Sequence, residues 1–267
     1  MHVRTTKALA ALAIAAGFAA TTLATPAIDS AVINTRIWND ASYSTVTTGN
    51  LYPSSLWIRD EGLDQTGWAN RHNFRLSANG GISEAVFMNN DAFAFASDVT
   101  ITGTANVEGG LNLSPWWSQE IDGVFMLNTE TGEVSVWGGR LPFFSFTNDF
   151  GITYTKGDTV RLGMIYDPHS LTETDPGTIQ YTYTDAGGNV FTSPVLAFDM
   201  GNPNEDPPYG LWGILNDARV GGYFMPKVND QIPGNWGEIH FDNMTFVPEP
   251  ASLAMLALAG LLALRRR

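Results

Sequence analysis

A two-residue alternation of apolar and polar side chains recurs along the chain, and it constrains the fold more than any other feature. Residues 160–166 and 179–184 both place an apolar or aromatic side chain at every second position. This is the period of a half-buried β-strand, because successive side chains of a strand point to opposite faces of a sheet. Residues 28–247 show no helical period longer than a turn or two. The central part of the chain is therefore expected to be all-β.

Turn signals separate these strands at short intervals. Glycine-containing loops of the hairpin type lie at 128–132 and 185–189, and the alternation slips at Asp242-Asn243, which indicates a β-bulge. About a dozen strand-like segments favour a two-sheet sandwich as the most economical architecture. We expect one domain over 28–247 with its clearest pattern at about 82–246, and we expect early strands and long loops before that.

Composition excludes several functional classes. The chain has no cysteine, so disulfides, zinc thiolate sites and cysteine nucleophiles are ruled out. Five of the 14 basic residues lie in the terminal segments but only one of the 27 acidic residues does, so residues 28–247 carry 9 basic and 26 acidic residues. Such a surface repels polyphosphates, and a nucleic-acid partner is not expected.

The N-terminal segment has the pattern of a secretory signal. Arg4 and Lys7 precede an apolar stretch over 9–20, and small residues follow near Ala24 and Ala27. This order of a basic, an apolar and a small-residue region predicts a signal peptide over 1–27, read by the secretion translocon.

The C-terminal segment is predicted to form a short apolar helix. Residues 251–264 are uncharged and are followed by Arg265, Arg266 and Arg267. Fourteen helical residues cover roughly 21 Å, which is less than the roughly 30 Å hydrocarbon core of a bilayer. The terminal arginines favour the cytoplasmic side, so the preceding domain should face outward.

Three elements stand in order at this end: Pro248-Glu249-Pro250, the apolar helix and the arginine tail. Together they resemble the PEP-CTERM sorting signal of Gram-negative bacteria. The resemblance covers about 21 of the 267 residues. It implies recognition by an exosortase-type membrane protease, transient insertion of the short transmembrane helix in the inner membrane, and removal of the tail. It also implies delivery to the cell surface or to an exopolysaccharide matrix.

Residues 82–246 resemble, at the level of pattern, the concanavalin-like jelly roll of lectins and glucanases. Laminarinase-like hydrolases of that fold carry a glutamate, an aspartate two positions on and a second glutamate three positions beyond. Here Glu120 and Asp122 match the first two, but Phe125 stands at the third position. The proton donor of a two-carboxylate mechanism is therefore absent from its expected place, and we expect a non-enzymatic domain.

Exposed aromatic rings can stack on sugar rings, and this chemistry gives the candidate glycan-binding residues. They are Trp116, Trp117, Trp137 and Trp212, with the nearby Glu120 and Asp122. The alternative for each tryptophan is a place in the core or against a loop. If the Trp116-Trp117 pair is extended, its side chains point to opposite faces, so one of the two should be exposed.

The sequence patterns for a metal site and for a catalytic triad are weaker. Asn204, Glu205 and Asp206 offer clustered oxygen ligands of the kind calcium takes, with a solvated acidic loop as the alternative. No cofactor is otherwise expected. His72, His169 and His240 are scattered, and local sequence suggests no Ser/His/Asp grouping, although distant residues can meet in a fold.

Three functions remain open from the sequence. The first is an exported surface or matrix protein whose jelly-roll domain binds extracellular polysaccharide without cleaving it. The second is a polysaccharide-active hydrolase or lyase of the same fold. The third is a structural matrix component with no specific ligand. Two ionisable groups at catalytic separation on one sheet face would favour the second over the first.

Overall fold

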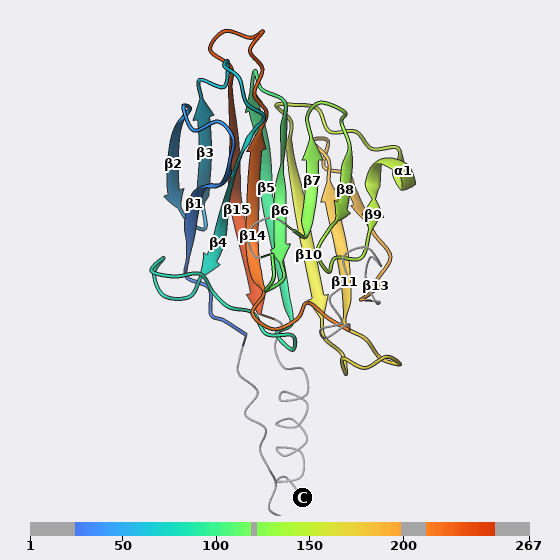
Figure 1. Cartoon of the computed structure of the whole chain (residues 1–267). Helices are drawn as coiled ribbons and strands as arrows, with labels where there is room; N and C mark the ends of the chain where they lie inside the picture. Colours follow the sequence, from blue (N-terminus) through green and yellow to red (C-terminus); the bar gives the residue numbers. More distant parts are fainter. Residues whose placement is uncertain (1–24, 119–121, 199–211, 249–267) are drawn as a thin grey trace, which may run out of the picture.

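A computed structural model of the chain describes residues 25–118, 122–198 and 212–248, which form a two-sheet all-β sandwich (Figure 1). Residues 1–24 of the predicted signal peptide 1–27 lie outside these ranges. So do the candidate residue Glu120, the acidic stretch with Asn204, Glu205 and Asp206, and the tail from Glu249 to Arg267. Within the described ranges, no helix has the length and apolar character needed to cross a membrane.

The first sheet has seven strands and the second has eight. In spatial order the seven-stranded sheet consists of β1 (Ser30–Asn39), β4 (Asn70–Ser77), β14 (Arg219–Pro226), β6 (Val107–Ser114), β7 (Val124–Asn128), β8 (Val134–Trp137) and β9 (Phe144–Ser145). The eight-stranded sheet consists of β12 (Val190–Thr192), β11 (Thr178–Thr184), β10 (Thr159–Asp167), β5 (Phe93–Gly103), β15 (Trp236–Pro248), β3 (Ser55–Glu61) and β2 (Thr45–Leu51), with β13 (Leu196–Ala197) paired to β11. Neighbouring strands pair antiparallel, and one short helix, α1 (Phe146–Phe150), follows β9.

The strands predicted from alternation are present where the pattern placed them. In β10 the buried side chains include Val160, Leu162, Met164 and Tyr166, and β11 alternates in the same way. The slip at Asp242-Asn243 is a register shift between Asp242 and Thr245 in the pairing of β15 with β5. Asn243 there has a φ of 48°, a left-handed conformation that suits a bulge.

Residues before 82 contribute β1 to β4, which are regular strands placed in both sheets. The sandwich therefore begins well before the region of clearest alternation. Aromatic rings join the two sheets in the core: Phe74 of β4 meets Phe241 of β15 at 4.8 Å between ring centroids, and Phe125 of β7 meets Tyr181 of β11 at 5.9 Å. These contacts fix which side of each strand faces inward.

Candidate functional site

The face of the seven-stranded sheet that points away from the core is polar, and we call it the outer face. On β4, Phe74 and Leu76 point inward, so the alternate residues Arg71, Asn73 and Arg75 point outward. On β6 and β14 the same alternation turns Glu108, Asn112, Ser114, Arg219 and Tyr223 outward.

Strand register aligns these side chains in rows across the sheet. One row runs from Arg75 through Gly221 and Asn112 to Val124 and Trp137, because each residue pairs with the next on adjacent strands. Directly paired residues of antiparallel strands share a face. Trp137, a predicted glycan-binding residue, therefore lies on the same face as Arg75, four strands away, and its side chain is 43% exposed.

Arg71 and Tyr223, in two neighbouring rows of the outer face, form a second pair of interacting side chains. Tyr223 pairs with Asn73 and Gly110, and the guanidinium carbon of Arg71 lies 4.4 Å from the centre of the Tyr223 ring. Burial lowers the pKa of the Arg71 guanidinium, and the nearby Tyr223, Asp122 and Glu108 act against this. Burial raises the pKa of the Tyr223 hydroxyl, which therefore stays protonated at neutral pH. Within the part of the chain that the structure describes, this hydroxyl has no hydrogen-bond partner.

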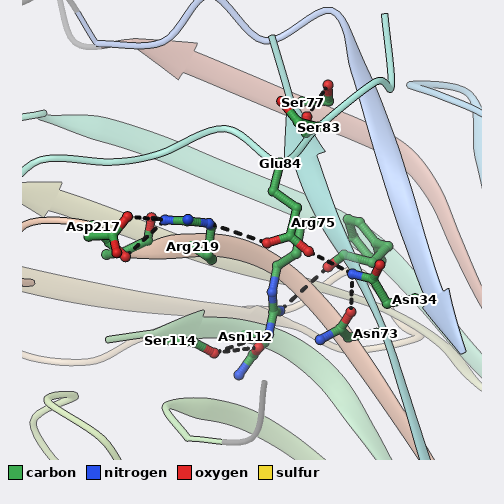
Figure 2. A network of polar contacts seen from close by, with 12 residues as sticks. Asn34, Asn73, Arg75, Ser77, Ser83, Glu84, Asn112, Ser114, Asp217 and Arg219 are labelled. Atoms are coloured by element: carbon green, nitrogen blue, oxygen red, sulfur yellow. Dashed lines mark hydrogen bonds and ion pairs between the residues drawn. The ribbon is translucent and has the colours of Figure 1, made fainter. Parts of the chain in front are cut away.

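Hydrogen bonds and ion pairs connect the outer face to its rim (Figure 2). The Asn34 amide donates to Glu84 Oε1 at 2.7 Å and to Asn73 Oδ1 at 3.0 Å. Glu84 Oε2 lies 3.2 Å from Arg219 Nε, and Arg219 Nη1 donates to Asp217 Oδ1 at 2.8 Å. The network thus joins β1, β4 and β14 to the loop that carries Glu84.

A second set of hydrogen bonds includes one that joins β4 to β6 across the intervening strand β14. Arg75 Nη2 donates to Ser114 Oγ at 3.1 Å, although β14 lies between β4 and β6. Gly221, the β14 residue opposite Arg75, has no side chain to obstruct this reach. Asn112 in turn donates to the backbone carbonyls of Asp122 and Gly123, both at 2.8 Å. The predicted residue Asp122 is therefore held at the outer face through its backbone.

The outer face is largely withdrawn from solvent despite its polarity. Arg75 and Asn73 are each 1% exposed and Arg71 is 7% exposed. Arginine is rarely buried to this degree unless it is paired, and burial of polar groups costs free energy. The side chains that solvent reaches lie at the rim, and they include Glu84, Asp122, Trp137 and Arg219.

The other predicted tryptophans occupy different places. Trp116 and Trp117 lie in a turn after β6, and their rings meet edge to face at 5.8 Å, with Trp116 44% exposed. One of the two is exposed, as predicted, but the turn brings the rings together where an extended segment would have separated them. Trp212 is half-buried in the turn before β14, where its carbonyl accepts a 2.6 Å hydrogen bond from the Gly177 N–H.

Two alternative chemistries are not assembled among the described residues. Phe125 lies in the core stacked on Phe146, so no second carboxylate follows Asp122 at the expected position. Within residues 25–118, 122–198 and 212–248, no group of three or more histidine and acidic side chains is suited to hold a metal ion.

A buried histidine–aspartate pair, which the sequence did not predict, lies in the core and not on the outer face. His72 Nε2 lies 3.1 Å from Asp60 Oδ2, and the Arg36 backbone N–H donates to His72 Nδ1 at 3.0 Å. Asn70 also donates to Asp60 Oδ2, at 2.7 Å. Both nitrogens of the ring are occupied, so His72 has no free position for a nucleophile, and the pair serves the structure.

Arg71, Asn73, Arg75 and Tyr223 were missed from sequence. A signal was available: β4 holds two of the nine basic residues of 28–247, four positions apart, with an asparagine between them. Four positions along a strand is the spacing of a shared face, and a polar residue at every second position of a strand with inward aromatic neighbours marks that face.

Comparison with known proteins does not assign the chain to a family. No family model matches the chain, and no curated protein matches it in sequence. Among solved structures the chain is similar to the alginate lyase AlgAT5 from Polysaccharide Lyase family 7, with 12% identity, 82% of this chain and 94% of that chain covered, and a TM-score of 0.43. It is also similar to lectin II from Ulex europaeus, with 10% identity, 83% and 94% coverage, and a TM-score of 0.40.

An alginate lyase from Corynebacterium sp. matches at 10% identity and a TM-score of 0.43, covering 82% of this chain and 93% of its own. At such values the likeness carries no argument about chemistry. The class of the protein, a two-sheet all-β sandwich, rests on its own strand pairing.

Proposed function

We propose that this is an exported cell-surface or extracellular-matrix protein whose concanavalin-like sandwich binds polysaccharide at the outer face of the seven-stranded sheet. The observation that carries the proposal is Trp137, whose 43% exposed ring lies on the same face as the buried polar side chains of Arg75 and Asn112. Sugars present hydroxyl groups for polar side chains and an apolar C–H face for an aromatic ring.

The outer face carries charges of both signs. Arg71, Arg75 and Arg219 lie there with Glu84, Glu108 and Asp122, and Arg219 is ion-paired with Glu84 and Asp217. Guanidinium groups match the geometry of carboxylates, so a polysaccharide with carboxylate groups is the first ligand to test. In this arrangement the buried arginines support the face, and the partly exposed Trp137 contacts the ligand.

Affinity gel electrophoresis of the purified protein tests the proposal. We expect migration to be retarded by a uronate polysaccharide such as alginate more than by the neutral glucan laminarin. Trp137→Ala should weaken the retardation about tenfold, a change of about 1.4 kcal/mol. Trp57→Ala is the matched control, because Trp57 lies on β3 of the other sheet. Equal migration of the wild-type protein with and without every polysaccharide would overturn the proposal.

A lyase of the same fold is the second candidate, and one observation favours it. Arg71 lies against Tyr223, whose hydroxyl remains protonated at neutral pH. A guanidinium that neutralises a uronate carboxylate and a phenol that transfers a proton are two of the groups an elimination needs, although the raised pKa of the Tyr223 hydroxyl and the burial of both groups act against this role. Incubation with alginate should then raise the ultraviolet absorbance of unsaturated ends, and Tyr223→Phe should abolish the rise. Binding with no rise in absorbance would leave the non-enzymatic function.

The cellular location of the protein is proposed from its terminal segments. Deletion of 249–267, which leaves β15 intact, should release the protein into the medium, because the short helix and arginines would no longer hold it at the membrane. Mass spectrometry of the mature protein should find no peptide from 251–267. Retention of the truncated protein in the envelope would contradict a sorting role for the tail.

A further inference from the structure

Phe143 is an exposed aromatic residue beside Trp137 at the β9 edge of the seven-stranded sheet, on the side where α1 follows (Figure 1). Val136 pairs with Phe144, and continuing this antiparallel register places Trp137 opposite Phe143. Residues directly opposite each other share a face, so both rings belong to the outer face. Their exposure agrees with this placement. Val136 and Phe144 lie in the core, whereas the two outward residues are 43% and 65% exposed.

The chain between the two rings is a short turn held by hydrogen bonds. The Leu141 N–H donates to the Gly138 carbonyl at 3.1 Å. The Tyr181 hydroxyl donates to the Pro142 carbonyl, also at 3.1 Å. Gly138 and Gly139 have φ angles of 82° and 56°, a left-handed conformation that glycine adopts without strain. The two rings are therefore presented on a preorganised backbone, which lowers the entropic cost of binding a ligand.

The rings of Trp137 and Phe143, which we call the two-ring platform, form a small surface that ends toward the middle of the sheet. Val124, the neighbour of Trp137 on β7, is 2% exposed, and Asn112 beyond it on β6 is fully buried. Aromatic side chains bury roughly 150–250 Å² each when covered, so at these exposures the platform offers roughly 200 Å². A stable protein interface needs roughly 800 Å² from each partner. The platform alone is therefore too small for a second copy of the chain, and it fits sugar rings, which present an apolar C–H face.

We propose that Phe143 and Trp137 bind two consecutive sugar rings, so that the protein recognises a short segment of a polysaccharide at the β8–β9 edge. The inference rests on the function proposed above, and it adds the second ring and the length of the bound segment. Adjacent strands lie about 4.8 Å apart, which is close to the length of one sugar ring, so neighbouring sugars can each meet one aromatic ring. Two linked contacts bind more tightly than either alone, because the second forms at high effective concentration. Toward the middle of the sheet, the buried residues of β7 and β6 in the row of Trp137 offer a longer chain no further contact.

Titration of the protein with the monosaccharide, trisaccharide and hexasaccharide of alginate, followed by NMR, tests the inference. The affinity of the wild-type protein should rise at least about tenfold from the monosaccharide to the trisaccharide, because the second ring is then engaged. It should rise less than about threefold from the trisaccharide to the hexasaccharide, because no further contact is added. Phe143→Ala should remove the first gain and leave binding of the monosaccharide at Trp137 unchanged. Phe143→Tyr keeps an aromatic ring and should keep most of the gain.

Phe150→Ala is the matched control for Phe143→Ala. Phe150 of α1 is also exposed, at 45%, but its ring contacts the core-facing rings of Phe144 and Phe146. It therefore packs against the core side of β9, away from the two-ring platform. This variant should match the wild-type protein with all three oligosaccharides.

The outcomes separate the two proposals. Absence of binding to every oligosaccharide by the wild-type protein overturns the polysaccharide-binding function itself. Unchanged binding of the trisaccharide by Phe143→Ala overturns only the two-ring platform. So does an affinity that rises as steeply from the trisaccharide to the hexasaccharide as from the monosaccharide to the trisaccharide. Light scattering gives a further readout: a dimer that dissociates in Phe143→Ala would mean that a second copy covers the rings, and this also overturns the two-ring platform.

Discussion

The two sheets of the sandwich present opposite kinds of outward surface. In β5 of the eight-stranded sheet, buried and half-exposed residues alternate, whereas all eight residues of β4 in the seven-stranded sheet are buried. The first pattern is that of a sheet with one face in water. The second belongs to a strand covered on both sides, and such strands are usually apolar throughout.

The charged groups of the two surfaces differ in the same way. On the eight-stranded sheet, Arg161 and Asp98 form a 2.7 Å ion pair whose side chains are 33% and 24% exposed. On the seven-stranded sheet, Arg75 is 1% exposed. Exposed pairs cost little and contribute little, while buried charged groups reduce stability unless fully satisfied. The comparison teaches that the seven-stranded sheet holds charged groups in a buried layer, whereas the eight-stranded sheet holds them at the solvent boundary.

The largest effect is expected at Gly221, which lies between Arg75 and Asn112. A Cβ atom there would lie 1.9 Å from the Phe74 carbonyl oxygen, so the β4 backbone would have to move. Gly221→Ala should lower the free energy of unfolding by about 3 kcal/mol or more. Gly187→Ala is the control, since its nearest atoms are side-chain atoms at 3.2 and 3.3 Å in an exposed turn. Similar urea midpoints for the two variants would contradict the close packing of β14 on β4.

The second-largest effect on the free energy of unfolding is expected at Arg75. Arg75→Met keeps much of the side-chain volume and removes the guanidinium that donates to Ser114 Oγ. We expect a loss of about 2 kcal/mol in urea unfolding, because buried polar partners lose a hydrogen bond. A gain in stability would contradict this prediction and show that the buried charge costs more free energy than its hydrogen bonds return.

A smaller change of opposite sign is expected at Tyr223. Tyr223→Phe removes a buried hydroxyl that has no partner among the described residues. The free energy of unfolding should rise by up to about 1 kcal/mol, because the cost of the unmade hydrogen bond disappears. If Tyr223 serves the ligand, polysaccharide binding or turnover should fall in the same variant. A clear loss of stability would mean that the hydroxyl is satisfied.

The smallest effect is expected on the eight-stranded sheet. Arg161→Met removes a partly exposed ion pair with Asp98 and hydrogen bonds to the Asn243 carbonyl and Thr245 Oγ1, and the expected loss is about 0.5 kcal/mol. Since salt screens exposed charges, the difference from the wild-type protein should shrink in about 1 M sodium chloride. A loss as large as that of Arg75→Met would remove the contrast between the two surfaces.

The eight-stranded sheet was largely predictable, and the reason is its solvated face. Water on one side enforces the alternation seen in β10 and β11, and that alternation is visible in the sequence. The bulge at Asp242-Asn243 was also visible, because the alternation of β15 changes phase there.

The strand β4 was not predictable by the same rule. Its sequence NRHNFRLS has only two apolar residues, and polar side chains occupy both of its faces. His72 points into the core and Arg71 points away from it, so no apolar period marks the strand. Trp137 was identified because a tryptophan in a strand is conspicuous, but its alignment with Arg75 depends on pairings across four strands that local sequence does not encode.

The hydrogen bond between His72 and Asp60 has a consequence for how the two sheets are aligned. It joins β4 of one sheet to β3 of the other, and Asn70 of β4 donates to the same Asp60 carboxylate. Apolar packing has little directional preference, so sheets can slide over one another at small cost. A buried donor and acceptor meet in one alignment only, and every other alignment would leave both unpaired. The hydrogen bonds of His72 and Asn70 to Asp60 therefore fix the alignment of the two sheets, and with it the position of β4 from which the outer face is built.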